Sequence, residues 1–454
     1  MTPASPKRFD LVVIGTGAGG SAPARKCAAA GWSVAIVDDQ PYGGTCALRG
    51  CDPKKVLVGA ADLLDWHRRM SGTGLAGEAS IDWAALMRFK RTFVADVPEQ
   101  RRESFARAGI ATYQGTARFL SQDVLLVGDE PLQADRFVIA SGAKPKRLGI
   151  AGEDLLRDST QFLELESLPP RLALVGAGYI GFEFAHIARR AGAAVTLLGR
   201  GQPLSRFEPE HVRLLVQHTR ALGVDVRLDA DVGAIEQRGA ELRLHFTTPA
   251  GADSVDVDAA VHSGGRSPAT DTLGLAAADV TADEHGAIRV NEFLQSVSNP
   301  RVYAAGDVAL SPGSLPLTPV AGHEAHIVAA NLLRGNSRTP DYSGTASVVF
   351  TVPPLAGVGL TESDARARHG EVVVKEGDTS EWYSSRRVRA GVGAFKTISE
   401  SSGGKLLGAH LLGHNAEEMI NLFALAIRTG LTADQLRHAI YGYPTSASDI
   451  AYMV

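Results

Sequence analysis

The 454-residue chain has few cysteines and no long apolar run, and both shortages narrow its class. Three cysteines are too few for the disulfide framework of a small secreted protein. Because no run approaches about 18 apolar residues, the sequence predicts no membrane-spanning helix. The opening residues, MTPASPKRF, lack the apolar stretch of a signal peptide. We therefore expect a soluble, cytoplasmic protein without a membrane partner.

The chain also lacks a strong excess of charge of either sign. Its 46 basic and 50 acidic residues leave a net charge of −4, without a basic stripe. Nucleic acid is therefore not expected as a main partner. A hydrophobic content of 44% excludes a disordered chain. At about 150 residues per domain, the length suggests roughly three domains.

Glycine, in contrast, is abundant and forms two matching clusters. In residues 9–38 an apolar strand (11–14) enters a glycine turn, an alanine-rich helix and a second strand (34–37). Residues 172–200 repeat this order, with the second strand at 195–198. The turn glycines are Gly15, Gly17 and Gly20, then Gly176, Gly178 and Gly181. In βαβ dinucleotide folds such glycines let the backbone approach a pyrophosphate at a helix N-terminus. Two such copies predict an α/β protein with two dinucleotide-binding domains.

The two copies differ where the second strand ends, and the difference predicts different cofactors. Asp38 lies 23 residues after Gly15 and can bind both hydroxyls of an unmodified ribose. The equivalent position of the second copy is Gly199, followed by Arg200 and later Arg206. Because guanidinium groups bind phosphate in bidentate geometry, they suit a 2′-phosphate. We therefore predict FAD in the first copy and NADPH in the second; alternatively, both arginines are surface charges.

Two cysteines lie close together in the segment GGTCALRGCDPKKVL, residues 43–57. Cys46 and Cys51 are five residues apart, which is not the spacing of a metal site. They can form a redox disulfide if a helix begins there, because a helix N-terminus and the cationic Arg49, Lys54 and Lys55 favour a thiolate. Two inert thiols remain the alternative at this point.

Together these features resemble the class I pyridine nucleotide–disulfide oxidoreductases, the family of glutathione reductase, dihydrolipoamide dehydrogenase and mercuric reductase. The resemblance covers nearly the whole chain. Further stretches similar to the family are VIASGAKP (138–145), GGRSP (264–268), VYAAGDV (302–308), LTPVAGHEA (317–325) and VVFTVPPLAGVGLTE (348–362).

The resemblance implies three domains and a homodimer. An FAD domain would comprise 1–150 and 270–338, an NADPH domain 151–269 and a C-terminal α+β dimerisation domain 339–454. Within the last domain, residues 415–440 have helical apolar spacing and are expected to form a helix followed by a strand. In this family the active site is shared, so Tyr443 would face the cysteine pair of the partner subunit.

The resemblance also implies roles for individual residues. Electrons would pass from NADPH through FAD to a Cys46–Cys51 disulfide, with Cys51 beside the flavin and Cys46 facing the substrate. Lys55 would lie near the flavin, paired with Glu183, and Tyr179 would cover the nicotinamide pocket. Implied FAD contacts are Gly15, Gly17, Gly20, Asp38, Gly44, Thr45, Ser141, Gly142 and Asp307. Implied NADPH contacts are Gly176, Gly178, Tyr179, Ile180, Gly181, Arg200, Arg206 and Gly265. No metal site is predicted.

The C-terminal segment departs from the family. Where its disulfide reductases carry His-Pro-Thr-x-x-Glu, this chain has Tyr443, and Ser448 at the Glu position, with Asp449 one residue later. A phenol, with an ordinary pKa of about 10, is a poor base at pH 7. The segment Asp52-Pro53-Lys54 also replaces the usual Ile-Pro-Ser.

These departures leave several hypotheses for the electron acceptor. The first candidate acceptor is a low-molecular-weight disulfide, as in glutathione reductase. The alternatives are a metal ion, as in mercuric reductase, or a quinone; the minor alternative is a non-catalytic nucleotide-binding subunit. Arg25 matches a position that binds substrate carboxylate in glutathione reductase, although it is also consistent with a solvated helix face.

Overall fold

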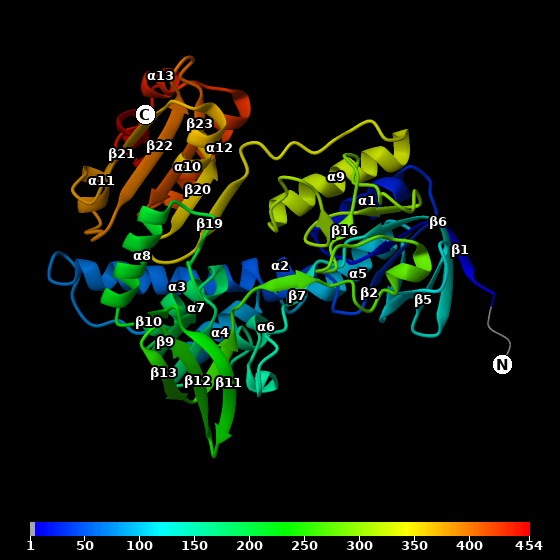
Figure 1. The fold of residues 1–454 in the computed structure, drawn as a ribbon, viewed down its shortest axis with the longest axis horizontal. Helices are drawn as coiled ribbons and strands as arrows, with labels where there is room; N and C mark the ends of the chain where they lie inside the picture. Colours follow the sequence, from blue (N-terminus) through cyan, green and yellow to red (C-terminus); the bar gives the residue numbers. More distant parts are fainter. Residues whose placement is uncertain (1–4) are drawn as a thin grey trace. The chain divides into compact units, whose positions relative to one another are not determined.

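The computed structural model describes residues 5–454, which form two compact units. The first unit comprises residues 5–54, 89–146 and 266–342, and the second comprises 55–88, 147–265 and 343–454 (Figure 1). The three predicted domain ranges stay a prediction. No helix within 5–454 is both long and apolar enough to cross a membrane.

A seven-stranded sheet is the centre of the first unit. Its order is β3-β2-β1-β6-β5-β4, with β17 paired to β6. The central strand β1 ends in four fully buried apolar residues, as expected for a parallel strand covered on both faces. The strands are β1 (Lys7–Ile14), β2 (Val34–Asp38), β3 (Ala111–Gln114), β4 (Ala117–Phe119), β5 (Val124–Val127), β6 (Glu130–Ile139) and β17 (Val302–Ala304).

Helices α1 (Ala18–Ala29) and α9 (Thr318–Arg334) pack against each other in this unit, and α1 follows β1 directly. After β2 come the short helix α2 (Gly44–Arg49) and the long helix α3 (Cys51–Met70), which continues into the second unit. The first unit is therefore a βαβ fold whose glycine turn lies next to the start of α2.

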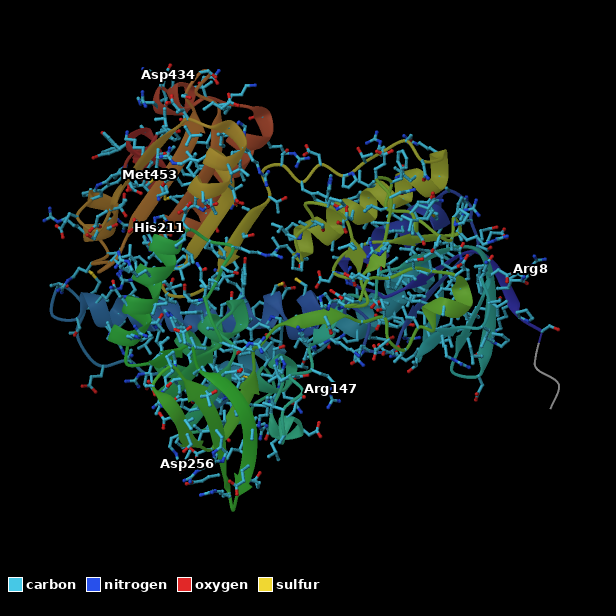
Figure 2. The ribbon with its side chains drawn as sticks, viewed as in Figure 1. Arg8, Arg147, His211, Asp256, Asp434 and Met453 are labelled. Carbon is cyan, nitrogen blue, oxygen red and sulfur yellow. The ribbon has the colours of Figure 1, made fainter. Side chains whose placement is uncertain are left out.

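The second unit contains a four-stranded parallel sheet in the order β10-β9-β8-β14. Helix α7 (Tyr179–Arg190) connects β8 to β9, and α8 (Pro209–Ala221) carries His211, labelled in Figure 2. An antiparallel sheet, β11-β12-β13, follows, in which Asp256 (Figure 2) binds Arg243. The strands are β8 (Arg171–Val175), β9 (Ala194–Gly199), β10 (Asp225–Leu228), β11 (Asp231–Arg238), β12 (Glu241–Thr248), β13 (Gly251–Val257) and β14 (Ala259–His262).

The C-terminal part of the second unit is a five-stranded antiparallel sheet in the order β19-β20-β23-β22-β21. Helix α12 (Ala416–Thr429) packs on β20 and β23 through apolar residues that include Phe423. The strands are β19 (Ala346–Val349), β20 (Leu355–Gly359), β21 (Val372–Asp378), β22 (Ala394–Glu400) and β23 (Leu406–Leu412).

The predicted α/β fold class is confirmed: two βαβ units and a C-terminal α+β part are present. One local prediction was wrong, because residues 415–440 contain no strand. Helix α12 ends at Gly430 in the left-handed conformation (φ 70°), and a second helix, α13 (Ala433–Arg437), begins after Thr432. Thr432 and Gln435 form a capping box there, and this signal favours a helix start.

Candidate functional site

The glycine turn of the first unit leaves no room for side chains. A Cβ on Gly15 would lie 2.2 Å from the Ala140 carbonyl oxygen, and one on Gly20 would lie 2.0 Å from that of Gly15. Gly44, at the start of α2, approaches the turn so closely that its Cβ would lie 2.5 Å from the Gly17 Cα. Bare backbone thus surrounds the N-terminus of α1, which is a geometry that suits a pyrophosphate.

Asp38 is held beside this turn by hydrogen bonds. Its Oδ2 accepts from the Thr16 backbone N–H at 2.8 Å and from the Thr16 hydroxyl at 2.5 Å, and Oδ1 accepts from the Gln40 N–H. Burial raises the pKa of Asp38, and these hydrogen bonds lower it. Each carboxylate oxygen keeps lone pairs for a further donor. The residue therefore fits the predicted ribose contact.

Other predicted FAD residues of this unit also suit a polar ligand. The Ser141 hydroxyl is buried and has no hydrogen-bond partner, a state that a ligand donor or acceptor would relieve. Burial raises the pKa of Asp307, and the charge of Arg266 lowers it. Gly142 is left-handed (φ 70°), and Thr45 is exposed on α2. The orphaned hydroxyl and the glycine-lined cradle together fit FAD.

The cysteine pair lies at the junction of two helices. Cys46 is in α2, Cys51 is the first residue of α3, and both are free thiols. The Cys51 Sγ lies 3.5 Å from the Thr318 hydroxyl at the start of α9. The Cys46 thiol donates to Asp52 Oδ1 at 3.8 Å. Thr318 and Asp52 act on both sulfurs, and the charge of Lys54 acts on Cys51.

These neighbours make the two thiols unequal. The hydrogen bond from Cys46 lowers the pKa of Cys51 to about 6 against the opposing effect of burial, with help from Thr318 and the charge of Lys54. The same bond, together with burial and the Asp52 charge, raises the pKa of Cys46. Cys51 is therefore the more acidic of the two thiols.

Lys54 is one of the three cations expected from the sequence to favour a thiolate. It is 9% exposed, and its charge acts on Cys51. The sequence does carry a signal for it, because Lys54 lies three residues after Cys51 and hence one helical turn away. The resemblance implies the lysine role for the next residue, Lys55.

In the second unit Lys55 and Glu183 contact the same residue. The Lys55 ammonium lies 4.2 Å from the centre of the Phe350 ring and 3.8 Å from a carboxylate oxygen of Glu417. The buried Glu183 accepts a hydrogen bond from the Phe350 N–H at 2.9 Å. Phe350 thus brings the two predicted residues together, and their direct pairing stays a prediction.

The second glycine turn repeats the first. Gly176 is left-handed (φ 121°), and a Cβ there would lie 2.4 Å from Ser263 and Gly264. A Cβ on Gly181 would lie 2.1 Å from the Gly176 carbonyl oxygen. Gly178 precedes α7, whose first two residues are Tyr179 and Ile180. The N-terminus of α7 is therefore lined by bare backbone, as a second dinucleotide requires.

The other predicted NADPH contacts each have different neighbours. Tyr179 packs 5.5 Å from the Phe207 ring; burial raises its pKa, and the nearby charge of Arg206 lowers it. Arg200 is 80% exposed, and its guanidinium lies 4.0 Å from the Asp231 carboxylate. Gly265 is left-handed (φ 107°) with open space around it. Both arginines are exposed, and their contact with a 2′-phosphate stays a prediction.

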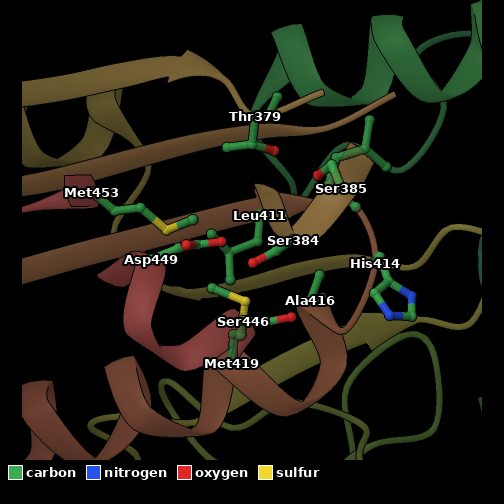
Figure 3. Close-up of a pocket in the computed structure, with 13 residues that line it drawn as sticks. Thr379, Ser384, Ser385, Leu411, His414, Ala416, Met419, Ser446, Asp449 and Met453 are labelled. Atoms are coloured by element: carbon green, nitrogen blue, oxygen red, sulfur yellow. The ribbon is translucent and has the colours of Figure 1, made fainter. Parts of the chain in front are cut away.

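The C-terminal segment does not rebuild the family's acid–base pair. Tyr443 is 83% exposed. Ser448 donates to the Thr445 carbonyl oxygen at 2.6 Å. Asp449 enters a cavity of about 30 Å³ beside Ser384 and Ser446 (Figure 3), where burial raises its pKa. Tyr443 does not line this cavity. Asp449 therefore does not take the place of the displaced Glu within this unit.

Two further predicted residues have internal contacts. Arg25 donates to the Ser104 hydroxyl at 2.9 Å and lies over the Phe105 ring, so its guanidinium is engaged within the unit. Cys27 is buried in α1, and burial raises the pKa of its thiol to about 12. Within residues 5–454, His, Cys, Asp and Glu side chains form no group of three or more that could hold a metal ion.

Comparison with known proteins agrees with this architecture. Residues 9–325 match the pyridine nucleotide-disulphide oxidoreductase family, and residues 345–454 match its dimerisation domain. The chain is 34% identical to a glutathione reductase of Burkholderia cepacia, over 97% of each protein. It is also 34% identical to a mercuric reductase of Streptomyces lividans, over 97% of this chain and 94% of that one.

A solved structure gives the same relationship. The Cu(II) complex of the HOCl-induced flavoprotein disulfide reductase RclA from Escherichia coli superimposes with a TM-score of 0.88 at 28% identity, over 98% of this chain and 99% of that one. The predicted family is thereby confirmed. The chain belongs to the pyridine nucleotide-disulphide oxidoreductases, a family of FAD-dependent enzymes that use NAD(P)H.

Proposed function

We propose that this enzyme uses NADPH to reduce a small acceptor through a redox-active Cys46–Cys51 pair. The observation that carries the proposal is the difference between the two thiols: the pKa of Cys51 is lowered and that of Cys46 is raised. Cys46, Thr318 and Lys54 lower the pKa of Cys51. A dithiol with its charge on one sulfur is suited to store two electrons and to pass them on through the other sulfur.

Two parts of the chain bind the cofactors in this proposal. Residues 1–150 and 270–338 would bind FAD, with the glycine turn at its pyrophosphate and Asp38 at its ribose. Residues 151–269 would bind NADPH, with Arg200 and Arg206 at the 2′-phosphate. When bound, FAD supplies two-electron transfer between a nicotinamide and a disulfide. A cytoplasmic location stays a prediction.

A low-molecular-weight disulfide is the first candidate acceptor. Cys46 carries a thiol that can exchange with a disulfide, and the Burkholderia cepacia relative is named a glutathione reductase. Exchange needs the Cys46 proton to move, and Tyr443 is a weaker base than the histidine it replaces. We therefore expect slow exchange at neutral pH that accelerates as the pH rises.

A thiophilic metal ion is the second candidate. Soft cations bind thiolates directly, so their reduction does not require an acid that protonates a leaving thiolate. The exposed Tyr443, with Ser448 turned to Thr445 and Asp449 in its own cavity, favours this alternative. Relatives named mercuric reductase and the Cu(II) complex of RclA agree with it. A quinone would receive electrons without either cysteine.

Cysteine variants test the proposal. Cys46→Ser and Cys51→Ser are each expected to lower NADPH oxidation with disulfides or Hg²⁺ at least a hundredfold, because each removes half of the exchanging pair. Cys27→Ser, a matched thiol removal outside the pair, is expected to retain activity within about threefold. Full activity of Cys46→Ser with all three acceptor classes would contradict the proposal.

A further inference from the structure

Asp52 stands directly beside the reactive pair and has no role in the proposed function. It follows Cys51 in α3, is exposed, and its Oδ1 accepts a hydrogen bond from the Cys46 thiol at 3.8 Å. Its charge acts on both sulfurs. A carboxylate is therefore fixed at the sulfur that an acceptor is proposed to meet.

The helix keeps this carboxylate in place. Asp52 lies in the first turn of α3, where the helix dipole stabilises negative charge. The next residue, Pro53, is buried and has a restricted backbone, which suits the first turn of a helix. The backbone of Asp52 is thus held in the first turn of α3, between Cys51 and Pro53. Its distance to Cys46 depends on local structure of the first unit alone.

The cations of the same segment do not cancel this charge at Cys46. Lys54 is buried, and its charge acts on Cys51. Arg49 is the last residue of α2, and the largest charge effects on the Cys46 sulfur are those of Cys51 and Asp52, which both raise its pKa. The charge effects ranked highest at Cys46 are therefore those of negative groups.

We infer that Asp52 is a specificity-determining residue that makes Cys46 select cationic acceptors over anionic ones. The shared chemistry is positive charge next to a sulfur-reactive centre, in either an ammonium-bearing disulfide or a thiophilic metal cation. The inference rests on the proposed function in one respect, namely that Cys46 is the sulfur that acceptors meet. It narrows the acceptor from any small disulfide to one that Asp52 attracts.

With a disulfide acceptor the step balances within the pair. The Cys46 sulfur forms a bond to one acceptor sulfur, the acceptor S–S bond breaks, and the Cys46 proton passes to the first leaving thiolate. The Cys51 thiolate then bonds to Cys46 and displaces the second half as a thiolate. The pair loses two electrons and becomes a disulfide, and the acceptor gains two electrons as one thiol and one thiolate.

The expected selectivity follows from Coulomb's law. For a unit charge about 6 Å from Asp52 in water, the rate of productive encounter changes by roughly threefold. The rate rises for a cation and falls for an anion. The preference for a cation over an anion of equal size is therefore about tenfold at low ionic strength, and salt reduces it.

A charge series of disulfides tests this on the holoenzyme. The series is cystamine (cationic), bis(2-hydroxyethyl) disulfide (neutral) and 3,3′-dithiodipropionate (anionic), with Hg²⁺ as a separate metal arm. Asp52→Asn is expected to lower the cystamine-to-dithiodipropionate ratio of kcat/KM about tenfold. Asp129→Asn makes the same charge change at an exposed turn of the same unit and is expected to leave the ratio unchanged. An unchanged ratio in Asp52→Asn would overturn the inference.

A second measurement needs no turnover. In Cys51→Ser protein, Cys46 is modified with a cationic and an anionic methanethiosulfonate, and Asp52→Asn is expected to lower their rate ratio about tenfold. Equal ratios with and without Asp52 would overturn the inference even if Cys46 carries turnover. In contrast, full reductase activity of Cys46→Ser would refute the proposed function. The ratio of modification rates would still test whether Asp52 selects cationic reagents. If Asp52→Asn does not fold, loss of the wild-type ratio in 0.5 M salt supports the inference, and a salt-independent ratio refutes it.

Discussion

At the scale of single residues, two opposite charges near the start of α3 lie close to the two reactive sulfurs. Asp52 faces the Cys46 thiol, and Lys54 lowers the pKa of Cys51. The order Cys-Asp-Pro-Lys therefore places a negative charge beside Cys46 and a positive charge that acts on Cys51. Substitutions of these residues should alter the two sulfurs separately.

Lys54→Met tests the positive charge. The pKa of Cys51 is lowered to about 6, so its thiolate exists above that pH and is lost as the pH falls through it. Without the ammonium the pKa rises and the thiolate is lost at a higher pH. Alkylation of Cys51 at pH 7 should then slow severalfold. Lys55→Met, the same change one residue later, should move the midpoint less; an unmoved midpoint in Lys54→Met would contradict this account.

The arginines after β9 test the cofactor prediction. Arg200→Ala and Arg206→Ala should each raise the KM for NADPH about tenfold and change the KM for NADH less than twofold, because only NADPH carries the 2′-phosphate. Arg213→Ala, an exposed arginine of α8, is the control. Steady-state kinetics with both nucleotides measures the effect, and equal changes in both KM values would refute the assignment.

Gly199 is unsuitable for the same test. A glutamate there would restore the carboxylate of an NADH site, but its Cβ would lie 2.6 Å from the Ala177 Cβ. The structure therefore favours the arginine variants over Gly199→Glu.

At the scale of elements, α7 is anchored by a buried cation. The Arg190 guanidinium is fully buried, donates to Asp65 of α3 at 2.8 Å, and donates to the Val352 carbonyl oxygen at 2.9 Å. Burial lowers the pKa of Arg190, and Asp65 raises it. The pair therefore ties α3 to α7 and to the loop after β19.

Arg190→Met should destabilise the protein by about 1–3 kcal/mol, because Asp65 would keep only Arg69 as a cationic partner and the Val352 carbonyl oxygen would lose its donor. Urea unfolding followed by circular dichroism measures this. The double variant Arg190→Met, Asp65→Leu should recover most of the loss, and the exposed Arg238→Met should cost less than about 0.5 kcal/mol. A single variant as stable as the wild type would show that the pair does not anchor α7.

Sequence patterns predicted the regular elements well and the local chemistry less well. The strands expected at 11–14, 34–37 and 195–198 lie in β1, β2 and β9, because fully buried parallel strands are continuous apolar runs. The strand expected before residue 440 is helical, because the Thr432 capping box outweighs the apolar pattern.

The site was predicted in outline only. Glycine spacing identified both turns because close backbone approach leaves no alternative residue. The different neighbours of Cys46 and Cys51 depend on Thr318, which is 267 residues distant from Cys51, and no local pattern shows that contact. The internal contacts of Arg25 and Asp449 were hidden for the same reason.

At the scale of the whole molecule, the C-terminal part indicates self-association. Its fully exposed Ile440 and the largely exposed Tyr443 and Leu425 belong to the region that matches the dimerisation domain. Such apolar side chains favour burial against a second copy. We therefore propose a homodimer, in which Tyr443 would reach the cysteine pair of the partner subunit.

Ile440→Asp tests this assembly. A charge at the centre of an apolar interface should shift the protein from dimer to monomer in sedimentation velocity and lower NADPH-dependent reduction at least tenfold. Leu120→Asp, a similar change on the first unit, should remain dimeric. A fully active monomer would show that each chain carries a complete site.

The most direct test of the central claim is an anaerobic titration of the purified flavoprotein with NADPH, followed by absorbance and by alkylation of thiols. If the cysteine pair stores the electrons, one equivalent of NADPH should convert Cys46 and Cys51 from a disulfide to two alkylatable thiols. A broad long-wavelength band from the Cys51 thiolate beside the flavin should appear with them. Bleaching of the flavin with no new thiols and no such band would contradict the account and exclude the cysteines from electron transfer.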